Sequence, residues 1–134
     1  MLAMEQVAAL LAAAGLGTPG KDLFVHRMPD GCPAGLVVLN RLAAQAIDWN
    51  LPRYRRDSFQ VVARHRLPLE AERLARRAME ALTLFGWREL PPAGAVERPT
   101  AVMFIRPRHE PIVYPRSESD LHEASVNYDF ACAA

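Results

Sequence analysis

One long apolar stripe constrains the fold of this chain more than any other feature. Between Leu67 and Phe85, apolar residues recur at spacings of three and four, the period of one face of an α-helix of about five turns. Pro68 suits the first turn of such a helix, and Gly86 suits the position just after its end. The stripe is broad and rich in alanine and leucine, so we expect it to cover a sheet. Its members are Leu67, Ala71, Leu74, Ala78, Leu82 and Phe85.

Five other segments have the alternating or continuous apolar pattern of β-strands. The first two are separated by a turn cluster at Pro29–Gly35, which predicts a hairpin. The fourth is apolar on both faces, which predicts a central position in the sheet. The last alternates cleanly, with Ala124, Val126, Tyr128 and Phe130 on one face. The segments are Asp22–Pro29, Gly35–Asn40, Ser58–Arg66, Thr100–Pro107 and His122–Cys132.

With a short N-terminal helix over Leu2–Ala14, these segments predict an α+β fold. We expect a mostly antiparallel sheet of about five strands with the long helix packed on one face. The 134 residues fit a single domain, residues 1–134. The segment Arg41–Asp57 has no clear period, and a connection of that length in a compact domain is usually functional or disordered.

Composition limits the classes of function. The net charge of +1 gives no overall attraction to nucleic acid or to an anionic membrane, and no run approaches the ~20 apolar residues of a membrane span. Glu5 and Gln6 interrupt the N-terminal segment, which has no basic start, so we expect a mature helix and synthesis in the cytoplasm. Cys32 and Cys132 lack metal-type spacing and predict two free thiols in a reducing compartment.

No pattern of reactive side chains predicts catalysis. The four histidines form no HxxxH or HxxE pair, and no GxSxG sequence occurs. The glycine-rich segment Gly15–Gly20 follows a helix and precedes a strand, the wrong order for a phosphate-binding loop. Glu118, Asp120 and Glu123 could pair for acid–base chemistry, but a solvated charged edge is the more common meaning. We therefore expect no enzyme activity, no cofactor and no metal.

Charge is segregated along the chain. Arg53–Arg66 carries five arginines and one acid, whereas Glu118–Asp129 carries four acids and no arginine or lysine. Opposite patches on one chain suit head-to-tail contacts, which close into a ring when the rotation permits. Pairing of the patches within one molecule is an equally open alternative. The arginines and aromatic residues of Arg53–Arg66 also leave open a small nucleic-acid-binding module.

Several stretches resemble a family of phage minor capsid proteins related to the tail terminators, or tail completion proteins, of long-tailed phages. They are, in order, GLGTPG (15–20), DLFVHRMPD (22–30), IDWNLPRYRRDSFQVVAR (47–64) and RHEPIVYPRSESDLHEASVNYDF (108–130), with the helix rich in alanine and leucine before the last. The resemblance implies a structural protein of the virion tail or neck. Such proteins form a homohexameric ring on the last ring of the tail tube, stop tube polymerisation and present a surface to the head–tail connector.

The resemblance also implies a lumen through which DNA passes without sequence-specific binding. By the same resemblance, we place the subunit interface on the arginine-rich loop and the acidic segment near the C-terminus. The interface residues so implied are Arg53, Tyr54, Arg55, Arg56, Arg64, Glu118, Asp120 and Glu123. A head–tail connector or stopper on the portal side is the alternative function. Trp87–Pro99, which we interpret as a connection, has the least counterpart in the family pattern.

Overall fold

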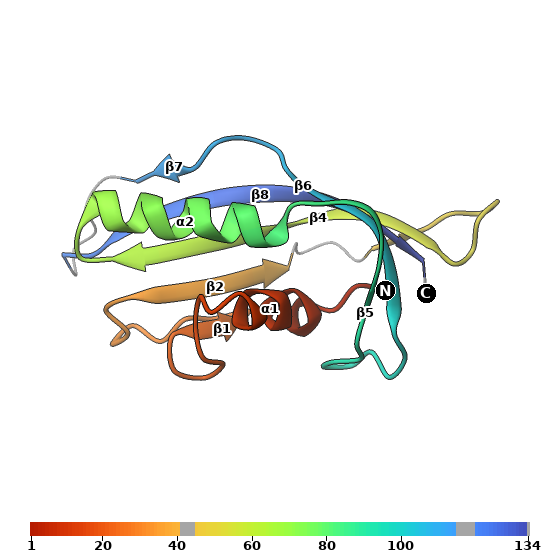
Figure 1. Cartoon of the computed structure of the whole chain (residues 1–134), viewed down its shortest axis with the longest axis horizontal. Helices are drawn as coiled ribbons and strands as arrows, with labels where there is room; N and C mark the ends of the chain where they lie inside the picture. Colours follow the sequence, from red (N-terminus) through yellow and green to blue (C-terminus); the bar gives the residue numbers. More distant parts are fainter. Residues whose placement is uncertain (41–44, 115–119, 134) are drawn as a thin grey trace.

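The computed structural model of the chain describes residues 1–40, 45–114 and 120–133. This part of the chain forms an α+β domain in which one sheet carries two helices on the same face (Figure 1). The helices are α1 (Met4–Ala13) and α2 (Pro68–Leu82). The strands are β1 (Leu23–Val25), β2 (Gly35–Asn40), β3 (Ala46–Ile47), β4 (Tyr54–His65), β5 (Leu84–Leu90), β6 (Thr100–Pro107), β7 (Ile112–Val113) and β8 (His122–Ala133).

The sheet has eight described strands rather than the five predicted. Its order is β1-β2-β4-β8-β6-β5, while β3 pairs with β4 and β7 pairs with β8. The additional strands are β3, β5 and β7. Strand β3 and the second half of β5 lie in the predicted connections Arg41–Asp57 and Trp87–Pro99, and β7 lies between the last two predicted strands. Strands β3 and β7 have two residues each, too few to show a period, and β5 begins inside the segment predicted to be helical.

The first two strands do not form the predicted hairpin. Strand β1 pairs with β2 in parallel, with Leu23 beside Leu36. The intervening residues 26–34 bring the chain back to the start of β1, where Gly35 lies against the Asp22 carbonyl. A Cβ atom at Gly35 would lie 2.6 Å from that oxygen, which explains why β2 begins with a glycine. The sequence pattern predicted both strands, but apolar alternation carries no information on strand direction.

Helix α2 is shorter than predicted. Because Thr83 is extended, the helix ends at Leu82, and its 15 residues make roughly four turns. The two outer members of the predicted stripe, Leu67 and Phe85, are 58% and 81% exposed and lie outside the helix. The stripe that faces the sheet consists of three small residues and one leucine. It comprises Ala71, Ala75, Ala78 and Leu82.

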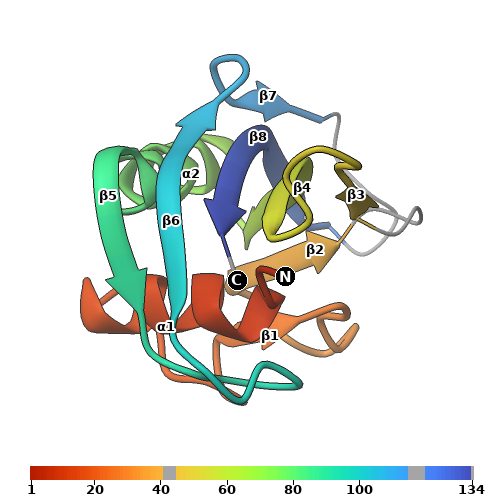
Figure 2. The same ribbon diagram turned by 90° about the vertical axis from the view of Figure 1, so that its right-hand side faces the viewer.

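Helix α1 confirms the predicted short N-terminal helix and contacts α2, β1 and β2 (Figure 2). Its buried Gln6 joins the helix to the β5–β6 connection. The Gln6 Nε2 group donates a hydrogen bond to the Pro91 carbonyl at 3.0 Å and to Thr100 Oγ1 at 3.1 Å. These bonds satisfy a buried amide and hold the two ends of the β5–β6 connection against the N-terminal helix.

Strands β4 and β8 form the centre of the sheet and pair over the whole length of β4. Phe59 lies opposite Tyr128, and Val61 lies opposite Val126, all facing the helices. The Phe59 and Tyr128 rings stack with centroids 5.1 Å apart. The predicted buried face of the last strand is therefore confirmed. Strand β6 lies between β8 and β5, in the interior of the sheet as expected.

Candidate interaction surface

The connection that lacked a clear period contains a hairpin that extends beyond the sheet. Strand β3 pairs with the start of β4, with Ala46 beside Arg56 and Ile47 beside Arg55. At the right of Figure 1, the yellow segment between β3 and β4 projects past the rest of the molecule. We call residues 46–56 the hairpin tip.

The hairpin tip is ordered by hydrogen bonds of its own. The Asp48 carboxylate accepts hydrogen bonds from the backbone N–H groups of Asn50, at 2.8 Å, and Leu51, at 3.0 Å. The N–H group of Tyr54 donates to the Leu51 carbonyl at 2.8 Å. The Arg55 guanidinium donates to the Tyr54 carbonyl at 3.0 Å. The hairpin tip therefore has a defined backbone conformation of its own.

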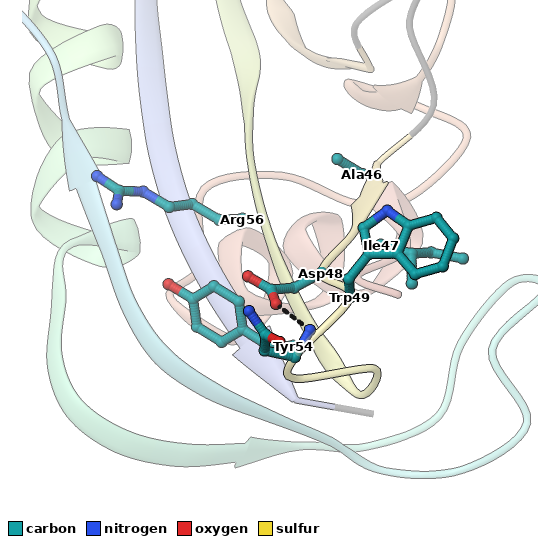
Figure 3. Close-up of a pocket in the computed structure, with 7 residues that line it drawn as sticks. Ala46, Ile47, Asp48, Trp49, Tyr54 and Arg56 are labelled. Carbon is teal, nitrogen blue, oxygen red and sulfur yellow. Dashed lines mark hydrogen bonds between the residues drawn. The ribbon is translucent and has the colours of Figure 1, made fainter.

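Three large apolar side chains of the hairpin tip are exposed. Trp49 is 98% exposed, Ile47 65% and Leu51 57%. Figure 3 shows Trp49 and Ile47 on one side of the hairpin and Tyr54 and Arg56 on the other, around a hollow of about 490 Å³. Clustered apolar side chains on a polar surface are typical of protein–protein contact sites.

Four of the predicted interface residues lie on the hairpin tip. Arg53 and Arg56 are exposed, whereas Tyr54 and Arg55 are half-buried. Among the residues that the structure describes, no carboxylate forms an ion pair with any of these three arginines. Guanidinium groups bind carboxylates and stack on aromatic rings, so the tip combines cations and apolar groups that suit a protein partner.

Of the predicted acidic residues, the two that the structure describes, Asp120 and Glu123, lie away from the hairpin tip. Arg64 pairs with Glu123 of the same chain, Nη2 to Oε2 3.5 Å, because the two are cross-strand partners on β4 and β8. Asp120 precedes β8 at the same end of the sheet, and Glu118 lies outside the described residues. The tip residue Arg56 lies eight positions before Arg64 on β4, which corresponds to roughly 26 Å along the strand. The structure thus brings Arg64 and Glu123 together and leaves the tip arginines away from Asp120 and Glu123.

A second polar cluster lies on the sheet face opposite the helices. Arg108 Nη2 donates a hydrogen bond to Asp129 Oδ1 at 2.6 Å. This hydrogen bond, with the charges of Arg108, Arg106 and Arg56, lowers the pKa of Asp129. The Arg106 guanidinium lies 5.0 Å from the centre of the Phe104 ring. The Arg108–Asp129 pair holds the chain against β8 where it leaves β6.

The sequence-based prediction missed an exposed aromatic pair on β5. Phe85 and Trp87 are both exposed on this edge strand, and Trp87 is 69% exposed. The pairing of β5 with β6 is irregular between Phe85 and Arg88, where Gly86 has a φ of +94°. The sequence held one signal, a glycine between two aromatic residues, but the helical spacing of Phe85 placed it in the apolar stripe instead.

The described residues contain no arrangement typical of a metal centre. No group of three His, Cys, Asp or Glu side chains in this part of the chain could hold a metal ion. Cys32 and Cys132 are free, and burial raises the pKa of the Cys132 thiol. Neither described helix has the length and apolar character needed to cross a membrane.

A chain with a similar fold occurs in the solved structure of a virion. A chain in the solved structure titled "Virion of native gene transfer agent (GTA) particle" superposes with a TM-score of 0.60 and 12% sequence identity. The match covers 96% of this chain and 84% of that chain. At this identity, the similarity shows a shared fold. The chain matches no curated protein.

The family comparison identifies the class of protein. A family model described as "Bacteriophage tail terminator protein" matches residues 10–133. The chain therefore belongs to the bacteriophage tail terminator family, which confirms the resemblance found in the sequence. The match includes all described strands and hence the hairpin tip and β5.

Proposed function

We propose that the chain forms a homo-oligomeric ring, expected to be a hexamer, at the head-proximal end of a phage tail tube. There it ends polymerisation of the tube and joins the tail to the head–tail connector. The family match over residues 10–133 carries this proposal. The fold shared with a chain of a gene transfer agent virion supports a place in a virion.

The hairpin tip supplies one side of the proposed contact between subunits, through Arg53, Tyr54, Arg55 and Arg56. A ring requires a heterologous contact, in which one surface of a subunit binds a different surface of its neighbour. The projecting tip, with its exposed apolar side chains and arginines, supports this role. The acidic side predicted at Glu118, Asp120 and Glu123, together with Arg64, has less support, because Glu123 is bound to Arg64 within the subunit.

Other partners follow from the same position in the particle. Besides a second copy, we propose contacts with the tail tube protein and the head–tail connector protein. DNA passes through the lumen without sequence-specific binding, and the net charge of +1 agrees with weak general affinity for DNA. The proposed location is the tail or neck of the virion, after synthesis in the bacterial cytoplasm. We propose no catalytic role, cofactor or metal.

The nucleic-acid-binding alternative draws little support from the geometry. Its basic strip, Arg53–Arg66, does not form one continuous cationic surface. Arg64 is paired with Glu123, and roughly 26 Å of strand separates it from Arg56. A regulator of this kind would bind heparin at low salt with an affinity that falls steeply as salt rises.

Cryo-electron microscopy of the neck of purified virions tests the proposal. We expect a sixfold ring of this chain between the last ring of the tube and the connector. Density on the portal side of the connector, without contact to the tube, would assign the chain to the head–tail connector class instead. Absence of the chain from purified particles would overturn the structural function altogether.

A further inference from the structure

The hairpin tip and β5 occupy opposite edges of the same section of the sheet. One row of cross-strand partners runs from Ala46 on β3 through Arg56, Ala131 and Phe104 to Phe85 on β5. In Figure 2, β3 is at the right-hand edge of the sheet and β5 is at the left-hand edge. Because the two edges lie at the same level, copies placed side by side bring the tip of one to the β5 edge of the next.

The hairpin tip presents apolar side chains beside cations. Ile47, Trp49 and Leu51 are exposed, and Arg53 and Arg56 have no ion pair among the described residues. Hydrogen bonds within the turn hold these groups in one shape. A preformed hairpin loses little conformational entropy when it binds, so more of the contact energy is available for affinity.

The outer side of β5, which we call the β5 edge, presents a complementary set of groups. Phe85 and Trp87 are exposed on it. Glu89 on the strand and Glu80 in the last turn of α2 are exposed carboxylates with no ion pair in the described part of the chain. Arg88 directly precedes Glu89 on β5, so the edge is mixed in charge. Exposed aromatic rings and carboxylates on one strand and the helix turn before it suit a partner that supplies apolar side chains and guanidinium groups.

We propose that the hairpin tip of one copy docks on the β5 edge of a second copy. The inference rests on the proposed ring and names its two contact surfaces. Trp49 and Trp87 are the anchors, and Arg53 and Arg56 bind the carboxylates of the β5 edge. The two surfaces differ and lie on opposite edges of the sheet. Each copy therefore binds one neighbour with its hairpin tip and a second neighbour with its β5 edge, which is the arrangement that closes into a ring.

Two single substitutions separate the halves of this contact. Trp49→Ala removes the anchor of the tip, and Trp87→Ala removes the anchor of the β5 edge. Each should weaken self-association by about 30-fold, the loss typical of an aromatic hot spot, measured by sedimentation velocity. Leu69→Ala, which truncates an exposed apolar side chain at the start of α2, is the matched control and should assemble normally. Unchanged thermal melting curves would show that all three variants fold.

A mixture of the two variants tests whether the contact is heterologous. The Trp87→Ala copy keeps an intact tip, and the Trp49→Ala copy keeps an intact β5 edge. These two surfaces can still bind, but the resulting pair has no further intact contact with which to grow. The equimolar mixture should therefore give one-to-one dimers and no rings, whereas each variant alone should stay monomeric.

A trapping experiment covers the case of a chain that is monomeric in solution. Asn50→Cys and Arg88→Cys place a thiol beside each anchor and leave both anchors in place, in a Cys32→Ser background. A bismaleimide should link the Asn50→Cys copy to the Arg88→Cys copy. It should not link the Asn50→Cys copy to itself or to a Leu69→Cys copy.

The outcomes distinguish the docking from the ring. Rings that form normally with Trp49→Ala and Trp87→Ala would overturn the docking and leave the ring intact. Normal rings that fail to attach to tail tubes would assign the tip to the tube protein and also overturn the docking between copies. Specific cross-links without a ring in virions would retain the docking and overturn the ring. If neither the specific cross-links nor a ring in virions is found, the proposed docking and the proposed ring are both overturned.

Discussion

Arg64 and Glu123 lie opposite each other on the two central strands, with Nη2 and Oε2 3.5 Å apart. The same guanidinium donates hydrogen bonds to the backbone carbonyls of Pro29, at 3.0 Å, and Cys32, at 3.4 Å. Arg64 therefore joins the connection between β1 and β2 to the centre of the sheet. Its role within the subunit is structural, and its charge is already paired.

This arrangement predicts unequal effects for the two partners. Arg64→Ala should lower the free energy of unfolding by about 1 to 3 kcal/mol, because it leaves two carbonyls and a carboxylate without their donor. Glu123→Gln should cost less than about 1 kcal/mol, since half-exposed ion pairs contribute little. Urea denaturation measures both. A loss of assembly by a stably folded Glu123→Gln variant would show that this carboxylate also contacts a neighbour.

Charge reversal at the hairpin tip should separate assembly from stability. Arg53→Glu combined with Arg56→Glu changes exposed side chains and leaves Arg55, which hydrogen-bonds within the turn, in place. We expect a melting temperature close to that of the wild type and a loss of ring formation, because like charges would face the acidic groups of the receiving copy. Lys21→Glu combined with Arg27→Glu makes the same charge change at exposed positions beside β1 and should assemble. Equal assembly by both double variants would remove the tip arginines from the interface.

The Tyr128 hydroxyl should be destabilising in its present position. It is buried and has no hydrogen-bond partner among the described residues, and burial raises the pKa of this phenol. Tyr128→Phe keeps the ring stacked on Phe59 and removes the unsatisfied group, so the free energy of unfolding should rise by about 1 kcal/mol. Guanidinium denaturation provides the measurement. A decrease of similar size would reveal that the hydroxyl has a partner after all.

The Arg108–Asp129 pair should make part of the stability depend on pH. Its hydrogen bond lowers the pKa of Asp129 in the folded chain, so its contribution is present above the ordinary carboxyl pKa of about 4 and is lost as the pH falls through the lower, folded value. Asp129→Asn should therefore be less stable than the wild type at pH 7 by up to about 1 kcal/mol, because the pair is partly exposed. That difference should shrink towards zero at low pH in denaturation curves. A constant difference would exclude this linkage.

The helices and strands that could be predicted from the sequence are those long enough to show a helical or alternating pattern of apolar residues. Strand β8 alternates over its whole length, and the helical stripe at Ala71, Ala78 and Leu82 identified the face that α2 buries. The parallel direction of β1 on β2 was not predictable, because the alternation of apolar residues is the same in parallel and antiparallel strands. Helical spacing also placed Phe85 in α2, although the chain is already extended at Thr83.

The candidate surface was predictable only in part. The unusual density of arginines near Arg53 marked the hairpin tip, although two-residue β3 left no pattern from which to infer a hairpin. Pairing of Arg64 with Glu123 could not be distinguished from intermolecular pairing, because the register of β4 on β8 is set by the complete sheet. Phe85 was missed because its spacing fits the helical stripe, and Trp87 because it was assigned to the connection that follows. Their exposure in the structure shows that both side chains face outwards.

The irregular edge at Gly86 has a consequence for how this molecule limits its own growth. A straight outer strand would offer a regular row of backbone donors and acceptors to any extended segment, and identical copies could then add to one another as an endless ribbon. The irregularity of β5 at Gly86 interrupts this row of backbone groups, so a second copy that binds this edge has to recognise the shape of its side chains. Recognition by shape accepts one partner in one orientation, and a chain built in this way can complete a finite assembly without starting a fibre.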